Sequence, residues 1–254
     1  MKAKGKLISI ITISFNNKEG LKKTIESVLP IKDNDIEFLV IDGGSTDGTK
    51  ELLNNYSENI DFLVSEKDYG ISDAFNKGVF NSNGKWLFFL NSGDTFSTKT
   101  SITKIKTDLF ANQHKFLCFY KVELSNGKAT MPTKEMIEKK GIDYIVNKAE
   151  IPHQGTFISK HLFTKYGMFS TSLKVRMDYD FFLRIRKESS NFIFIDNIIA
   201  NYEVGGISNQ VENFDKFIME GIISKIQNKV KLNLKDLYYI FYFLFLRRKK
   251  YAFA

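Results

Sequence analysis

Polar side chains that could bind a ligand or take part in catalysis follow each of four apolar segments in the first hundred residues. Asp42 stands in IDGGSTDGT, Asp68 in SEKDYG and Asp94 in NSGD, while FNN at 15–17 follows the first segment. Ligands of open parallel sheets bind outside the carboxyl ends of the strands, so residues that directly follow strands are candidate site residues. Turn chemistry and helix capping explain any one cluster. Four clusters in succession favour a shared ligand site.

The sequence contains neither of the two common glycine-rich loops that bind the phosphates of a nucleotide. Neither GxGxxG nor GxxxxGK[ST] occurs in the sequence, which argues against a Rossmann dehydrogenase and a P-loop enzyme. A bound diphosphate would then need a divalent cation, and oxygen ligands suit Mg²⁺ or Mn²⁺. Asp94, directly after the apolar WLFFL segment, is the best-placed metal ligand.

The elements that must position these residues follow from the apolar pattern. Near-continuous apolar runs predict buried strands at 7–13, 36–41, 60–64 and 86–90. Helical spacing between them predicts helices at 19–29, 46–56 and 71–80. This alternation predicts right-handed crossovers and a doubly wound α/β sheet. In the second half we predict strands near 116–123, 155–159 and 192–204, and helices near 159–166, 179–188 and 211–230.

Composition limits the classes of protein that the chain can belong to. The 24 Phe and 11 Tyr among 254 residues supply a large core and exclude a disordered chain. A single cysteine, Cys118, excludes a disulfide scaffold and is predicted to be a buried strand thiol. The N-terminal apolar run is short, rich in β-branched residues and lacks a cleavage site, so it reads as a first strand and not as a signal peptide. We expect a cytoplasmic protein.

The segments together resemble family 2 of the glycosyltransferases. The resemblance rests on ISIITISFNNKEGLKKTIESV, EFLVIDGGSTDGTKELL and SEKDYGISDAFNKGVFNSNGKWLFFLNSGD, and continues through IPHQGTFISKHLFTKYGMF, MDYDFFLRI and YEVGGIS. It implies a GT-A (Rossmann-like) α/β fold over residues 1–208, with a mostly parallel central sheet and flanking helices. It also implies a hexosyltransferase-type enzyme that moves a sugar, with inversion, from a nucleoside-diphosphate sugar, usually a UDP-sugar. The acceptor would be a glycan or a lipid-linked glycan, as in the bacterial branch that builds surface polysaccharides.

Carried over residue by residue, the resemblance implies a donor side, a metal ligand and an acceptor side. The donor nucleotide and sugar would contact Thr12, Ser14, Phe15, Asn16, Asp42, Asp68, Asp73, Asn76, Lys77 and Asn91, with Asp42 on the base. Asp94 would hold Mn²⁺ or Mg²⁺. NSGD departs from the family pattern, because Asn91 and Gly93 stand where acids are often found, and this predicts weaker metal affinity. The acceptor or diphosphate side would include His153, Gln154 and Asp180.

MDYDFFLR contains the predicted catalytic base. An inverting transfer needs a base that removes the acceptor hydroxyl proton as that oxygen attacks the anomeric carbon, and the resemblance assigns this role to Asp178. Helix positions two apart point in different directions, so Asp180 is not equivalent to Asp178. We favour a helix-start or supporting role for Asp180, and we expect Arg184 to pair with a local acid.

The net charge of +8 belongs mostly to the C-terminus. Residues 225–254 contain eight basic residues and one acidic residue, whereas the remainder contains 29 basic and 28 acidic residues. Ten apolar residues at 237–246 precede RRKK; as a helix they would rise about 15 Å, too short to span a bilayer. We predict an amphipathic, basic helical extension over 209–254 that anchors the enzyme on the inner face of the cytoplasmic membrane. The alternative is that 237–246 packs on the catalytic domain or on a partner subunit.

Two other functions remain open at this stage, and one is excluded. A nucleotidyltransferase would release pyrophosphate, and a non-catalytic nucleotide-sugar-binding protein would bind the donor without turnover. A nucleic-acid partner is not expected, since the nearly neutral body offers no extended cationic face.

Overall fold

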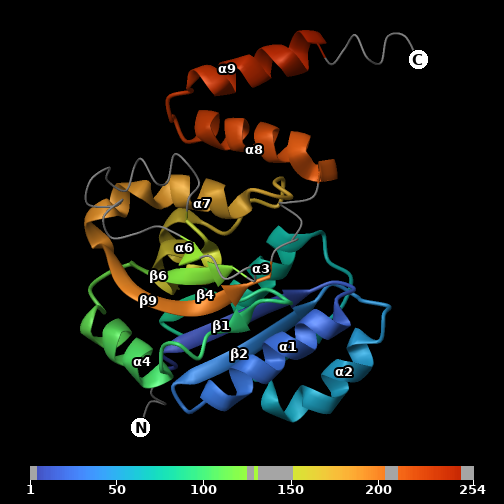
Figure 1. Cartoon of the computed structure of the whole chain (residues 1–254), viewed down its shortest axis with the longest axis vertical. Helices are drawn as coiled ribbons and strands as arrows, with labels where there is room; N and C mark the ends of the chain where they lie inside the picture. The colour runs from blue at the N-terminus through green and yellow to red at the C-terminus, as the bar shows by residue number, and fades with distance from the viewer. Residues whose placement is uncertain (1–4, 125–128, 131–150, 204–210, 247–254) are drawn as a thin grey trace.

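The computed structural model describes residues 5–124, 129–130, 151–203 and 211–246, which fold around one twisted sheet (Figure 1). The strands are β1 (Ile8–Ser14), β2 (Ile36–Asp42), β3 (Phe62–Ser65), β4 (Trp86–Phe89), β5 (Thr95–Phe96), β6 (Leu117–Leu124), β7 (Ala129–Thr130), β8 (Thr156–Ser159) and β9 (Phe192–Tyr202). Their order is β3-β2-β1-β4-β8-β6-β9-β5, with β7 paired to β6. In this part of the chain β1, β2, β3, β4, β6 and β9 share one direction, and β5, β7 and β8 oppose it. The predicted α/β fold with a mostly parallel sheet is confirmed.

Helices cover both faces of the sheet because the buried strands are apolar on both sides. One face receives α1 (Lys18–Val28), α2 (Thr49–Tyr56) and α4 (Ile102–Ala111). The other face receives α3 (Ile71–Asn81), α6 (Lys160–Tyr166) and α7 (Met177–Ile185). Successive strand residues divide between the two cores: Ile10 packs with the first set and Ile11 with the second. Short 3₁₀ turns complete the body at η1 (Leu29–Ile31), η2 (Ser57–Asn59), η3 (His153–Gly155) and η4 (Arg186–Asn191).

The predicted elements are found with boundaries shifted by a few residues. The predicted strands and helices of the first ninety residues correspond to β1–β4 and α1–α3. One helix and two short strands were not predicted: α4 and β5, both within 95–115, and β7. Cys118 is fully buried in β6, as predicted.

Two further helices lie beyond α7, at the end of the molecule away from α1 and α2 (Figure 1). They are α8 (Phe214–Gln227), preceded by η6 (Val211–Asn213), and α9 (Leu234–Phe241), continued by the π-helical η7 (Tyr242–Leu246). The predicted helix over 211–230 therefore corresponds to η6 and α8. The RRKK segment, with the rest of 247–254, lies outside the described residues, as do residues 204–208 of the YEVGGIS motif.

A buried ion pair holds α9 against α8. The Lys225 ammonium lies 2.9 and 2.7 Å from the two carboxylate oxygens of Asp236, and the Lys225 side chain is only 10% exposed. Asp236 also completes a capping box with Asn233 at the start of α9. In the described segments no helix combines the length and apolarity that a membrane span requires.

Candidate active site

The loop after β2 is organised by Asp42. Its carboxylate is completely buried and accepts hydrogen bonds from the backbone N–H of Gly44 (3.2 Å) and Ser45 (3.0 Å), and from the hydroxyls of Ser45 and Ser65 (2.7 Å for Ser65). These four donors fold the GGS segment over the end of β2. Asp42 thus shapes the loop beside the donor side, and its contact with a base stays a prediction.

Phe15 presents an exposed ring at the same edge. Its side chain is 64% exposed and lies beside Gly43, where a Cβ atom would stand 3.3 Å from the ring and 2.5 Å from Oδ2 of Asp68. Glycine at 43 therefore lets Asp68 and Phe15 approach the β2 backbone from two sides. Asn16 adopts a left-handed conformation (φ 48°) and bonds Ser45 and Thr46 through its N–H and its amide oxygen. An open aromatic face beside polar groups can stack a flat heterocycle.

Other residues predicted on the donor side hold the scaffold together. Thr12 is buried, and its hydroxyl donates to the carbonyl oxygen of Leu90 at 2.7 Å. The Asn76 amide bonds both the N–H and the carbonyl of Phe169 at 2.9 Å. Lys77 pairs with Glu66 at 2.7 Å, which raises the pKa of its ammonium, and lies 3.5 Å from Asp73. Ser14 is buried and bonds Ser92 at 3.5 Å.

Asp94 is a buried carboxyl with a raised pKa at this edge. The residue is 3% exposed, and burial raises its pKa to about 6, although the N–H of Glu203, the His153 ring and the Gln154 amide offset part of the rise. Gln154 is itself buried. The Glu203 N–H donates to Oδ1 of Asp94 at 3.0 Å. Asp94 thus carries a charge that its own protein environment does not fully compensate.

The donor set around Asp94 fits a hard divalent cation. Two buried oxygens here lack a hydrogen-bond partner among the described residues, Oδ2 of Asp94 and Oδ1 of Asn91. Oxygen atoms without partners are the ligands that Mg²⁺ and Mn²⁺ prefer. The described segments contain no group of three or more His, Cys, Asp or Glu side chains arranged to hold a metal. A cation here would therefore rest on Asp94, the Asn91 amide oxygen and phosphate oxygens of the donor.

Glu203 also lies at this point, and the sequence analysis did not single it out. Besides its N–H contact with Asp94, its carboxylate lies against Gly93 (φ 105°), where a Cβ would stand 2.5 Å from Oε2. The side chain is half-exposed. Its position directly after β9, a strand parallel to β1, is the signal that could have found it.

His153 joins Asn91 to the predicted base. Its Nδ1 lies 3.0 Å from Oδ2 of Asp178, and its Nε2 lies 3.1 Å from Nδ2 of Asn91. With the Asn91 amide in this orientation Nε2 accepts, so Nδ1 carries the proton and donates it to the Asp178 carboxylate. The structure thereby brings Asn91, His153 and Asp178 into one hydrogen-bonded row.

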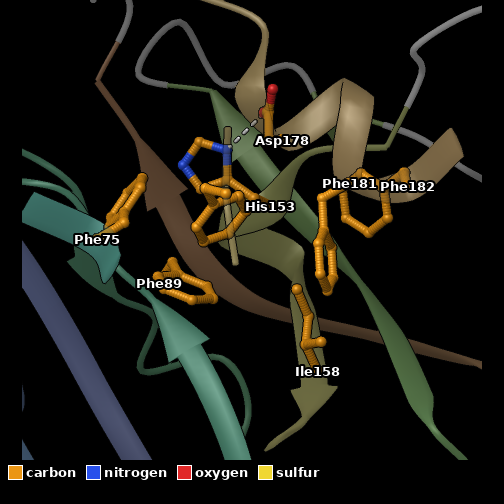
Figure 2. Close-up of a pocket in the computed structure, with 8 residues that line it drawn as sticks. Phe75, Phe89, His153, Ile158, Asp178, Phe181 and Phe182 are labelled. Atoms are coloured by element: carbon orange, nitrogen blue, oxygen red, sulfur yellow. Dashed lines mark hydrogen bonds and ion pairs between the residues drawn. The ribbon is translucent and has the colours of Figure 1, made fainter. Parts of the chain in front are cut away.

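An apolar floor lies beneath this row. Figure 2 shows the His153 and Asp178 side chains above a small cavity lined by Phe75, Phe89, Ile158, Phe169, Phe181 and Phe182. The Phe75 ring meets the imidazole edge-on at 5.9 Å. A wall of rings excludes water from one side of the carboxylate, which strengthens its remaining electrostatic contacts.

These contacts hold Asp178 in its charged form. Burial raises the pKa of the Asp178 carboxyl, but the hydrogen bond from His153, the N–H of Tyr179 (2.7 Å) and the nearby Arg176 outweigh burial, so the pKa lies below its usual range. The side chain keeps 28% of its surface exposed. A charged carboxylate with one accessible side can accept a proton.

The Asp180 carboxylate binds residues outside the row that ends at Asp178. The residue is buried, and its two oxygens bond Nε of Arg184 at 2.9 Å and Nδ2 of Asn228 at 3.0 Å. These contacts fasten α7 to the end of α8 and give no support to a place on the acceptor or diphosphate side. The expected pairing of Arg184 with a local acid is confirmed.

Comparison of the sequence with known proteins places this geometry in a family. The family model described as glycosyl transferase family 2 matches residues 9–251. A glycosyltransferase of Mycobacterium tuberculosis is 30% identical over 195 residues, which cover 70% of this chain and 68% of the relative. A PGL/p-HBAD biosynthesis glycosyltransferase of Mycobacterium bovis is 26% identical over 212 residues, covering 81% of this chain and 80% of the relative.

Solved structures share the fold at low sequence identity. TarS 1–349 of S. aureus, in complex with UDP-GlcNAc, superposes with a TM-score of 0.68 at 16% identity. The match covers 92% of this chain and 69% of TarS 1–349. In the structure of a longer TarS chain, the match covers 41% of that chain. The mannosyltransferase PcManGT of Pyrobaculum calidifontis, in complex with GDP-Man and Mn²⁺, has a TM-score of 0.64 at 11% identity, over 95% of this chain and 70% of PcManGT. With a family model that matches nearly the whole length, the chain belongs to glycosyl transferase family 2 and is a glycosyltransferase.

Proposed function

We propose that this glycosyltransferase moves a sugar from a UDP-sugar to a hydroxyl of a glycan acceptor, with inversion and with Asp178 as the base. The observation that carries the proposal is the row Asn91–His153–Asp178, which runs from Asn91, whose backbone bonds the buried Asp94, to a charged carboxylate. The row lies at the carboxyl edge of the sheet, where the donor side and the base would meet.

The donor side supports a nucleoside diphosphate as ligand. The exposed Phe15 ring, the Gly43 backbone and Asp68 offer a flat surface with polar edges for a base and ribose. The TarS and PcManGT complexes contain UDP-GlcNAc and GDP-Man, so sugar donors of this class bind proteins of this fold. When bound, a divalent cation would offset the charge on the donor phosphates, and Asp94 and Asn91 are the residues that would hold it.

The transfer itself is a single displacement. The acceptor oxygen forms its bond to the anomeric carbon while its proton passes to the Asp178 carboxylate. The bond between the anomeric carbon and the diphosphate oxygen breaks, and the nucleoside diphosphate leaves with the electron pair. The His153 N–H keeps Oδ2 of Asp178 oriented, so the carboxylate approaches from one fixed direction.

A panel of nucleotide sugars with Mn²⁺ tests the donor assignment. We expect a thermal shift and nucleoside diphosphate release with one or a few UDP-sugars, and proton NMR of the product should show the opposite anomeric configuration to the donor. Release of pyrophosphate would instead indicate the nucleotidyltransferase. Binding without turnover, with every acceptor offered, would indicate a non-catalytic binding protein.

We also propose that the acceptor is lipid-linked, a polyprenyl-diphosphate glycan, and that the C-terminal helices bind an anionic membrane surface in bacterial surface polysaccharide synthesis. Large apolar side chains stand exposed along α9 and η7: Leu234, Leu237, Tyr238, Phe241, Leu244 and Phe245. Exposed lysines accompany them at positions 229, 231 and 235. Apolar side chains flanked by cations suit the headgroup region of a bilayer.

The exposed pair Phe241 and Phe245, whose ring centroids are 4.9 Å apart, allows a precise test. In flotation with vesicles containing phosphatidylglycerol, the double variant Phe241→Ser/Phe245→Ser should lose most of its binding, because two exposed rings no longer enter the interface. Deletion of residues 231–254 should have at least the same effect.

The matched control is Phe110→Ser on α4, which removes an even more exposed ring far from α9 (Figure 1). This variant should float like the wild type. Unchanged flotation of the double variant would contradict the membrane proposal. A change in oligomeric mass instead of flotation would show that 237–246 packs on a partner subunit.

A further inference from the structure

The segment that precedes Asp178 is held by a residue from far along the chain. Glu220, in the middle of α8, is buried, and its carboxylate accepts three backbone hydrogen bonds. Oε1 accepts from the N–H of Lys174 at 2.8 Å, and Oε2 accepts from the N–H groups of Val175 at 2.8 Å and Arg176 at 2.9 Å.

This carboxylate binds the segment that leads into α7. The N-cap residue of α7 is Arg176, whose own side chain makes no capping hydrogen bond. Glu220, from another helix, accepts from the N–H of this N-cap residue and of the two residues before it, so it fixes the backbone that leads into α7 and places a negative charge near the start of the helix. Asp178 is the second residue of α7, so its position follows from the place where the helix begins.

The Arg176 side chain adds a second contact between this segment and α8. Its guanidinium carbon lies 4.0 Å from the ring centre of Tyr179 on α7 and 4.2 Å from that of Phe217 on α8. Gly221 allows this approach, because a Cβ there would stand 3.1 Å from Nη1 of Arg176. A cation between two aromatic faces joins the two helices.

The clamped segment also touches the donor side. The Lys174 ammonium donates to the carbonyl oxygen of Tyr69 at 2.7 Å, and the Ser72 hydroxyl donates to the carbonyl of Leu173 at 2.7 Å. Residues 173–176 therefore lie between the loop that contains Asp68 and the helix that contains Asp178.

We propose that Glu220 is a positioning residue of the transfer reaction, which sets the Asp178 carboxylate by fixing the backbone of residues 174–176. The inference rests on the proposed role of Asp178. It makes α8, which follows the motifs of the family resemblance, a working part of the active site.

Glu220→Gln in the full chain tests the proposal. The amide offers one acceptor oxygen, and its NH₂ group faces a backbone N–H, so the segment should shift. We expect kcat to fall between about 10- and 100-fold, as for a small misplacement of a reacting group. The KM for the donor should change by less than about threefold, because this interaction acts on the base and not on donor binding.

A double-variant cycle separates positioning from general destabilisation. Glu220→Gln should slow the wild type but should scarcely change the residual rate of Asp178→Asn, since the group that it positions has already been removed. An equal loss in both backgrounds would overturn the proposal. Glu212→Gln, an exposed glutamate in η6 just before α8, is the matched control and should keep the wild-type kcat.

The possible results separate the proposed role of Asp178 from the proposed role of Glu220. If Asp178→Asn keeps wild-type activity, the proposed base is wrong and the role of Glu220 falls with it. If Asp178→Asn is inactive but Glu220→Gln keeps the wild-type kcat, only the positioning role is overturned. Should Glu220→Gln fail to fold, Glu220→Asp keeps the charge and shortens the reach; a smaller fall in kcat at constant KM is then expected, and a wild-type kcat would refute the proposal.

Discussion

Asp178→Asn is expected to slow sugar transfer by about 10²- to 10⁴-fold while the affinity for the donor stays close to that of the wild type. The amide keeps the shape of the side chain, and its single oxygen can replace one of the two acceptors, Oδ2 for the Nδ1–H of His153 or Oδ1 for the N–H of Tyr179. It has no capacity to take the acceptor proton. Initial rates of nucleoside diphosphate release, with donor binding measured by calorimetry, check both parts.

Asp196→Asn provides the matched control for this variant. Asp196 is an exposed carboxylate of β9 that pairs with Lys121, away from the row that ends in Asp178. Its replacement should leave transfer and donor binding unchanged. Near-normal transfer by Asp178→Asn would remove Asp178 as the base.

Asp94→Asn is expected to lower activity about 10²-fold or more and to remove most of the dependence of donor binding on Mn²⁺. The estimate follows from the several kcal/mol of charge stabilisation that a metal ion supplies to a transition state. An amide oxygen is a weaker ligand than a carboxylate, and Asp94 is the strongest ligand that this edge offers. Donor binding titrated with and without Mn²⁺ checks the prediction; unchanged Mn²⁺ dependence would contradict it.

The same substitution should stabilise the metal-free protein above pH 6. Burial raises the pKa of Asp94 from 3.8 to about 6 in the folded state, so the folded protein binds this proton more tightly than the unfolded chain. The free energy of unfolding therefore falls as pH rises from about 4 to 6, by up to about 3 kcal/mol, and the deficit persists at higher pH. Asp94→Asn removes this deficit, so it should melt above the wild type at pH 7.5 and no higher at pH 3.5.

Much of the sheet was predictable because its strands are covered on both faces. Segments such as IEFLVID must be strands between two helix layers, and the amphipathic spacing of α1 and α3 left few alternatives. By contrast, α4 was missed although Ser101 caps it and Ile105 and Leu109 face the core at helical spacing. The signal was present, but the polar and lysine-rich residues between these positions obscured the pattern.

Residue roles were less predictable than residue positions. Ser45 lies directly before the predicted helix at 46–56, yet it bonds Asp42 and Asn16, and α2 begins after Gly48. The row from Asn91 through His153 to Asp178 joins three segments that are far apart in sequence. Glu220 lies farther away still. Contacts of this kind depend on how helices pack, which local spacing does not encode.

Because of the buried pair between Lys225 and Asp236, α9 is attached rigidly and is not a flexible tether. A loose tether would raise the local concentration of the enzyme and leave its orientation free. Here α9 is joined to α8, and α8 binds the backbone before Asp178, so a surface that bound α9 as proposed would also set the height and tilt of the edge that contains Asp178. A chain growing from that surface would meet Asp178 only once its tip reaches this height. The enzyme would then measure its acceptor by length as well as by chemistry.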